Sequence, residues 1–144
     1  MSARWLVVVG SAAALTACMA ETPPPRPVAA ADGCSILASR GWSATLDKMP
    51  GPGPSGPSLT IAGEVDLPTP GYRTELVAGP ADRMMPPSQR FRLIATAPGG
   101  MVAQVVTPTR VAYRARADYP AYRSIVILCG ERTITTISDV AVVN

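Results

Sequence analysis

The chain contains few side chains that could carry out acid–base chemistry. It has no histidine, which removes the commonest general base and the commonest metal ligand. Glu64 and Asp66 are two positions apart, a spacing that places both carboxylates on one side of a strand. A glycosidase would use such a pair, but this side lies opposite an apolar face, so a solvated pair is favoured. Lys48, the one lysine, precedes a glycine–proline loop, and we do not expect a serine–lysine dyad there. The sequence therefore predicts no catalytic residue and no enzyme activity.

The three cysteines give no metal or redox motif. Cys18, Cys34 and Cys129 are far apart, and neither zinc-binding nor redox-active C-x-x-C spacing occurs. We accordingly expect no metal site and no cofactor.

The N-terminal residues have the pattern of an export signal. Arg4 is followed by Trp5–Ala17, 13 residues without a charge. As a helix this run would reach about 20 Å, short of the roughly 30 Å hydrocarbon core of a bilayer. Its end, Leu15-Thr16-Ala17-Cys18, resembles the lipobox of bacterial lipoproteins. The resemblance implies that residues 1–17 are cleaved, that diacylglycerol and a fatty acid such as palmitate modify Cys18, and that the lipid holds the chain on a membrane.

The residue after Cys18 bears on location. In Gram-negative lipoproteins an Asp at this position commonly retains the protein at the inner membrane, whereas this chain has Met19. The resemblance thus implies the outer membrane, with the periplasmic face of the inner membrane as the alternative. In such an oxidising compartment Cys34 and Cys129 are expected to form a disulfide, the alternative being two buried free thiols.

The charge of the chain argues against nucleic acid. Without residues 1–17, which contain Arg4, twelve basic residues face ten acidic ones, a net charge of +2. Nucleic-acid binders usually carry a concentrated basic face instead. Envelope proteins or polysaccharides remain as partners.

Beyond a proline-rich tether, which with Cys18 covers residues 18–32, residues 33–144 are expected to form one all-β domain. Apolar residues alternate with polar ones, and prolines and glycines separate the runs. We predict an immunoglobulin-like β-sandwich of about eight short strands, with a small antiparallel β-barrel as the alternative. Strand patterns cover residues 34–39, 42–47, 59–67, 72–78, 90–97, 101–107, 110–115, 122–129, 132–137 and 140–143.

Several of these patterns make specific predictions. Trp42 is expected in the core. Pro98-Gly99-Gly100 predicts a hairpin between residues 90–97 and 101–107, and Gly130-Glu131 predicts one between residues 122–129 and 132–137. Pro108 is expected to interrupt a strand.

Two surface features are candidates for binding. Arginines and tyrosines gather in one segment, where they could grip an anionic sugar or an acidic protein, although both types are also common in exposed strands. The apolar Met84-Met85-Pro86-Pro87 segment favours closing one end of the core over binding a partner. The basic and aromatic candidates are Arg110, Tyr113, Arg114, Arg116, Tyr119, Tyr122 and Arg123.

One loop carries a second resemblance. Pro68-Thr69-Pro70-Gly71-Tyr72 is similar to the Pro-Thr-Thr-Gly-Tyr loop of chagasin-type inhibitors of cysteine proteases, which are immunoglobulin-like. Their loop plugs the protease cleft beside a glycine-rich loop, which Pro98-Gly99-Gly100 matches in part. Leu67 replaces the preceding Asn of the family, and no Arg-Pro-Trp occurs. The resemblance implies a protease inhibitor as the alternative to a non-catalytic binding or structural domain.

Overall fold

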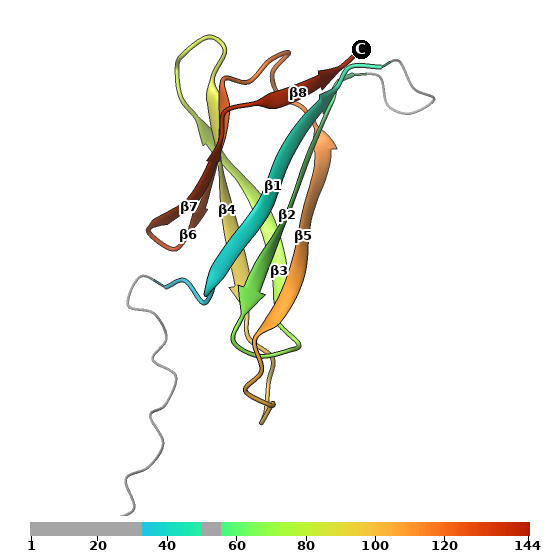
Figure 1. The fold of residues 1–144 in the computed structure, drawn as a ribbon. Helices are drawn as coiled ribbons and strands as arrows, with labels where there is room; N and C mark the ends of the chain where they lie inside the picture. Colours follow the sequence, from blue (N-terminus) through green and yellow to red (C-terminus); the bar gives the residue numbers. More distant parts are fainter. Residues whose placement is uncertain (1–32, 50–55) are drawn as a thin grey trace, which may run out of the picture.

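The domain is a sandwich of two β-sheets. The computed structural model describes residues 33–49 and 56–144, which contain no helix that could span a membrane. One sheet has the strand order β5-β2-β1-β8 and the other β3-β4-β6-β7, and the sheets are not closed into a barrel (Figure 1). The predicted β-sandwich is therefore confirmed, and the barrel alternative is wrong. The strands are β1 (Ala38–Asp47), β2 (Ser58–Leu67), β3 (Arg73–Ala81), β4 (Ser88–Thr96), β5 (Thr107–Arg116), β6 (Ser124–Cys129), β7 (Arg132–Ile137) and β8 (Val140–Val143).

Each sheet combines antiparallel pairs with one parallel pair. β8 lies parallel to β1, with Ala44 opposite Val140, and β6 lies parallel to β4, with Phe91 opposite Ile127. The other pairs are antiparallel. Parallel neighbours cannot be joined by a tight turn, so β5 in the opposite sheet lies between β4 and β6 along the chain.

The core forms where the inward faces of the two sheets meet. In β2 the alternation is as predicted, because Leu59, Ile61, Val65 and Leu67 are buried while the residues between them are partly exposed. Across the sandwich, the rings of Phe91 and Tyr113 meet edge to face with centroids 4.9 Å apart. Such pairs stabilise beyond their buried area. Other buried apolar residues are Leu46, Leu76, Leu93, Val111, Ile125, Ile127 and Ile137.

The first predicted strands are one strand in the structure. β1 begins at Ala38 and continues through Gly41, with a bulge between Arg40 and Ser43. Gly41 adopts φ +63°, a backbone conformation that a bulge accommodates. The break between two strands that the sequence predicts at residues 40–41 is therefore a bulge within one strand. Residues 34–37 precede the strand, so the prediction of a strand at 34–39 is wrong over that part.

The predicted hairpin at Pro98 does not exist. β4 and β5 belong to different sheets, so residues 97–106 form a connection across the sandwich and residues 101–106 are not a strand. Pro108 does not interrupt β5 either. It lies opposite Asp66 on an edge strand, where a residue without an N–H is tolerated.

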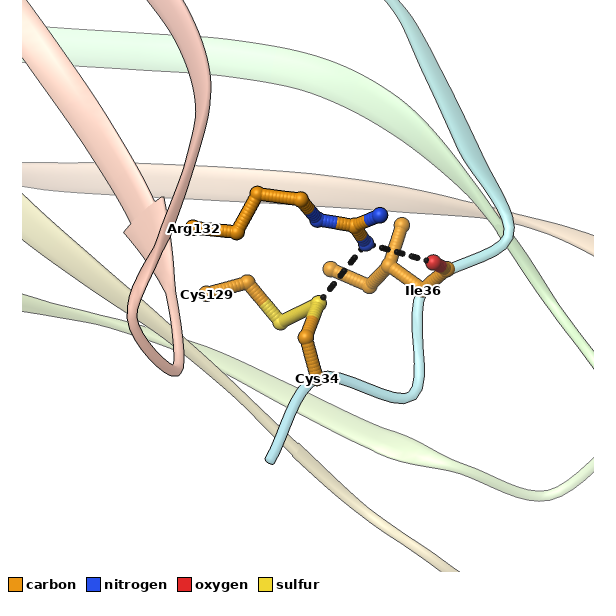
Figure 2. The surroundings of a disulfide bond; sticks show 4 residues. All are labelled: Cys34, Ile36, Cys129 and Arg132. Atoms are coloured by element: carbon orange, nitrogen blue, oxygen red, sulfur yellow. Dashed lines mark hydrogen bonds between the residues drawn. A yellow bond between two sulfur atoms is a disulfide. The ribbon is translucent and has the colours of Figure 1, made fainter. Parts of the chain in front are cut away.

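The predicted hairpin at Gly130-Glu131 is confirmed, and a disulfide lies beside it. Cys129 pairs with Arg132 across the turn. Cys34 and Cys129 are bonded, with S–S 2.04 Å, so the predicted disulfide is confirmed (Figure 2). Arg132 Nη2 donates to the Ile36 carbonyl at 2.9 Å and contacts Cys34 Sγ at 3.2 Å, as Figure 2 shows. The bond joins the segment before the first sheet to a central strand of the second.

The two ends of the sandwich differ. We call the loop end the one that carries residues 68–72, between β2 and β3, and residues 97–106, between β4 and β5; it is the lower end in Figure 1. The far end carries the β3–β4 loop, residues 82–87, and the strand β8. The Leu37 N–H donates to the Asp66 carbonyl at 2.9 Å. Since β2 finishes with Asp66 and Leu67, the first backbone hydrogen bond between the entering chain and the sandwich lies at the loop end.

Candidate functional site

The two carboxylates considered for catalysis are bound by an arginine. Arg40, next to the β1 bulge, makes a bidentate pair with Asp66 at 2.7 and 2.9 Å and also contacts Glu64. The hydrogen bonds from Arg40 lower the pKa of Asp66 and raise that of the guanidinium. A glycosidase acid needs a raised pKa. Asp66 therefore lacks the electrostatics of a general acid, and the two carboxylates form a salt-bridged group with Arg40 instead of the freely solvated pair that was predicted.

Three candidate arginines form a row on the outer face of β5. Arg110, Arg114 and Arg116 are exposed and occupy alternate positions of one strand face. In β2 they lie opposite Glu64, Thr60 and Ser58. Arg40 already pairs with Glu64, and within residues 33–49 and 56–144 none of the three arginines makes an ion pair. At about 3.4 Å per residue the row extends over about 20 Å. We call it the β5 arginine row.

The tyrosines of the predicted patch face elsewhere. Tyr113 packs on Phe91 inside the sandwich, and Tyr122 is buried. The Tyr122 hydroxyl accepts the N–H groups of Asp118 and Tyr119 at 3.1 and 3.4 Å, which holds the β5–β6 connection. Burial raises the pKa of both Tyr113 and Tyr122. These rings stabilise the fold and do not share the surface of the β5 arginine row.

Arg123 belongs to the far end. Its Nη1 lies 3.4 Å from Met84 Sδ, and its N–H donates to the Pro87 carbonyl at 2.8 Å. In the predicted core-closing segment Pro87 is buried, whereas Met84 and Met85 are exposed. Only part of that segment thus covers the core. The structure places the candidate arginines on at least two separate surfaces.

The 68–72 loop lies against the connection after β4. A Cβ on Gly71, whose φ is +87°, would come within 3.3 Å of Pro98 Cβ. The two segments in the resemblance to protease inhibitors are therefore neighbours. Thr69, however, is only 6% exposed, so its side chain is turned inward, while Pro70 and Gly71 are exposed.

Residues 101–106 are the largest departure from the sequence prediction. Instead of a strand they form an exposed apolar loop, in which Met101 is fully exposed and Val105 and Val106 are more than half exposed. No residue from 93 to 109 carries a charge. We call residues 101–106 the apolar loop.

No group of three or more acidic or cysteine side chains in the described ranges could hold a metal ion. Cys18 and the proline-rich segment lie outside those ranges. No family model, curated protein or solved structure matches this chain.

Two features of the candidate surfaces are not predicted by the sequence. Arg40 was not singled out, although its partners Glu64 and Asp66 were, because its contact with them depends on the pairing of β1 with β2. The apolar loop was read as a strand. The sequence signal for this loop is the absence of charge over the 17 residues 93–109. A buried strand has the same composition, so the signal does not distinguish the two.

Proposed function

We propose that this chain is a lipid-anchored, non-catalytic binding protein of the cell envelope, and that the β5 arginine row is its contact with an acidic partner. The Leu15-Thr16-Ala17-Cys18 pattern supports the anchor, and the absence of an acidic residue at position 19 supports the outer membrane over the inner. The Cys34–Cys129 disulfide is in keeping with an oxidising compartment.

One observation carries the binding surface. Arg40 pairs with both carboxylates that β2 presents on this face, and among the described residues none of Arg110, Arg114 and Arg116 makes an ion pair. The outer face of the other sheet also has three exposed arginines, but Arg73 lies on β3 whereas Arg90 and Arg92 lie on β4, so they do not form a row along one strand. Exposed guanidinium groups bind carboxylates and phosphates through paired N–H donors. An anionic envelope polysaccharide fits this row, and an acidic protein is the other candidate.

Binding to an acidic polysaccharide tests the row. Replacing Arg110, Arg114 and Arg116 with Ala should weaken retention on immobilised polygalacturonate roughly tenfold or more, if each exposed contact contributes about 0.5 kcal/mol. A matched control replaces Arg73, Arg90 and Arg92, which removes the same charge from the opposite sheet. Equal losses in both triple variants would mean that only net charge matters and would contradict the proposal.

The anchor has its own test. Cells expressing the full chain incorporate a labelled fatty acid, and the Cys18→Ala variant should lose the label. Label that persists in the variant would contradict lipidation at Cys18.

A second candidate function is inhibition of papain-like cysteine proteases through residues 68–72. The closeness of Gly71 to Pro98 favours it, since the resembling inhibitors use a neighbouring glycine-rich loop. The candidate predicts that the intact domain inhibits such a protease and that replacing Thr69 and Gly71 together abolishes inhibition. Met85→Ala, in the exposed β3–β4 loop at the far end, is the control. An intact domain that does not inhibit would exclude this function.

A further inference from the structure

The apolar loop is exposed where a water-soluble domain would normally be polar. Met101 is 103% exposed, Val105 58% and Val106 55%. The neighbouring 68–72 loop is also uncharged. Contiguous exposed apolar side chains mark a surface that contacts something other than water.

The position at which the chain joins the sandwich shows what this surface faces. The entering chain is attached first by the Cys34–Cys129 bond, at the end of β6, and then by the backbone bond from Leu37 to Asp66, near the end of β2. Both attachments lie in the half of the sandwich nearer the loop end, which carries the apolar loop (Figure 1). Fifteen residues, 18–32, separate the proposed lipid at Cys18 from the described domain. Even fully extended they reach no more than about 50 Å. A chain held at Cys18 therefore keeps its entry into the domain within about 50 Å of the bilayer, a distance at which the apolar loop can reach the membrane surface.

We infer that the apolar loop, through Met101, Val105 and Val106, is a second membrane contact that inserts into the bilayer holding the lipid. The inference rests on the proposed anchor. A short tether raises the effective concentration of the loop at the membrane, so a weak apolar contact is occupied. Because no charge lies between residues 93 and 109, this contact does not depend on anionic lipid or on salt.

A bilayer fits this loop better than a second copy of the chain. Stable protein interfaces bury about 800 Å² on each partner, and a projecting loop of six residues offers less than that. A bilayer needs no matching shape. With the loop end on the membrane, β5 leads away from the bilayer, so the β5 arginine row stays accessible to a partner.

Fluorescence quenching tests the contact in the complete mature lipoprotein. The Val105→Trp variant is reconstituted into phosphatidylcholine vesicles in high salt, with lipids brominated in their acyl chains. The signal of Trp42 is subtracted using the wild-type chain. We expect the introduced indole to shift to shorter wavelength and to lose fluorescence. The matched control is Met85→Trp, at an exposed site of the far end, which should be unquenched.

The outcomes separate the loop from the anchor. If the chain floats with the vesicles but the indole at position 105 is not quenched by brominated lipid, the inference is overturned and the anchor stands. The same holds if the indole fluorescence shifts to shorter wavelength without bromine quenching, which would mean that a second copy of the chain covers it. If the chain does not float and Cys18 carries no lipid, the anchor fails, and the membrane contact fails with it. Adding Met101→Asp and Val106→Asp to Val105→Trp should remove the quenching while the chain still floats.

Discussion

The indole of Trp42 lies directly over Gly63. A Cβ at Gly63 would come within 2.3 Å of Trp42 Cδ2, closer than real contacts allow. The indole Nε1 is buried and has no hydrogen-bond partner among the described residues, so the contribution of Trp42 is packing. Gly63 thus belongs to the apolar face of β2 because the side chain that fills its place comes from β1.

Gly63→Ala should therefore destabilise the domain. The added methyl group overpacks the core, which costs about 1–3 kcal/mol in the free energy of unfolding. Urea denaturation measures the change. In a Trp42→Ala background the same substitution should cost much less, since the methyl group then has space, and this coupling identifies the contact. Gly99→Ala, where nothing lies within 4 Å, should change stability by no more than about 0.5 kcal/mol. An equal loss at both glycines would contradict the packing argument.

Stability should fall at acidic pH through Asp66. Arg40 lowers the pKa of Asp66 in the folded domain below its unfolded value of about 3.9. A group with a depressed folded pKa stabilises fully above the unfolded pKa, and that contribution disappears as the pH falls through the folded pKa. Thermal unfolding from neutral pH to about pH 2 should show the loss. Asp66→Asn should flatten this part of the profile.

Asp82 provides a matched comparison for that profile. Its carboxylate accepts the N–H groups of Ser88 and Met84 at 2.9 and 3.1 Å, which lowers its pKa in the same direction. Asp82→Asn should also flatten the acid limb, and the double variant with Asp66→Asn should flatten it most. A double variant with the wild-type acid limb would show that neither carboxylate is linked to folding.

Tyr122→Phe should loosen the connection between β5 and β6. The hydroxyl accepts two backbone N–H groups, and each lost bond reduces the free energy of unfolding by about 0.5–1.5 kcal/mol. Tyr119→Phe is the control, because the Tyr119 ring packs on Tyr122 with centroids 5.8 Å apart while its hydroxyl makes no hydrogen bond in the described part of the chain. Faster amide exchange at Asp118 should accompany the first variant only. Identical unfolding curves for both would count against the role of the hydroxyl.

Reduction of the disulfide should cost about 2–5 kcal/mol, because it releases a loop whose ends are 95 residues apart. The measurement compares denaturation of the mature chain carrying Cys18→Ala with and without reductant. Intact mass under non-reducing conditions should be lower by two hydrogen atoms. Unchanged stability on reduction, with the mass shift present, would show that the bond does not constrain the unfolded chain.

Strand alternation made much of this fold predictable. The pattern of Leu59 to Leu67 gave both the strand and its buried face, and Gly130-Glu131 gave the turn. The predictions that were wrong depend on which strands are neighbours in the sheets, which the alternation pattern does not show. Whether Pro108 breaks a strand depends on whether that strand lies at an edge, and β5 does.

The candidate site was less predictable for the same reason. Arg114 and Tyr113 are adjacent in sequence, yet alternation directs one outward and the other into the core. Judged by composition alone, the arginines and tyrosines of this segment form one patch. Only the face of the strand on which each side chain lies shows that they do not. The apolar loop has the residue types of a buried strand, and what distinguishes it is the absence of a neighbour to pair with.

The Cys34–Cys129 bond also has a mechanical consequence. A pull on the chain ahead of Gly33 reaches this covalent bond before it reaches the first hydrogen bond of the sandwich, between Leu37 and Asp66. The disulfide would transfer the tension to β6, a central strand of the second sheet. The hydrogen bonds of β1 would therefore not be broken one after another from its N-terminal end. The disulfide thereby protects the domain from unfolding at the end of the chain where the proposed lipid at Cys18 would hold it.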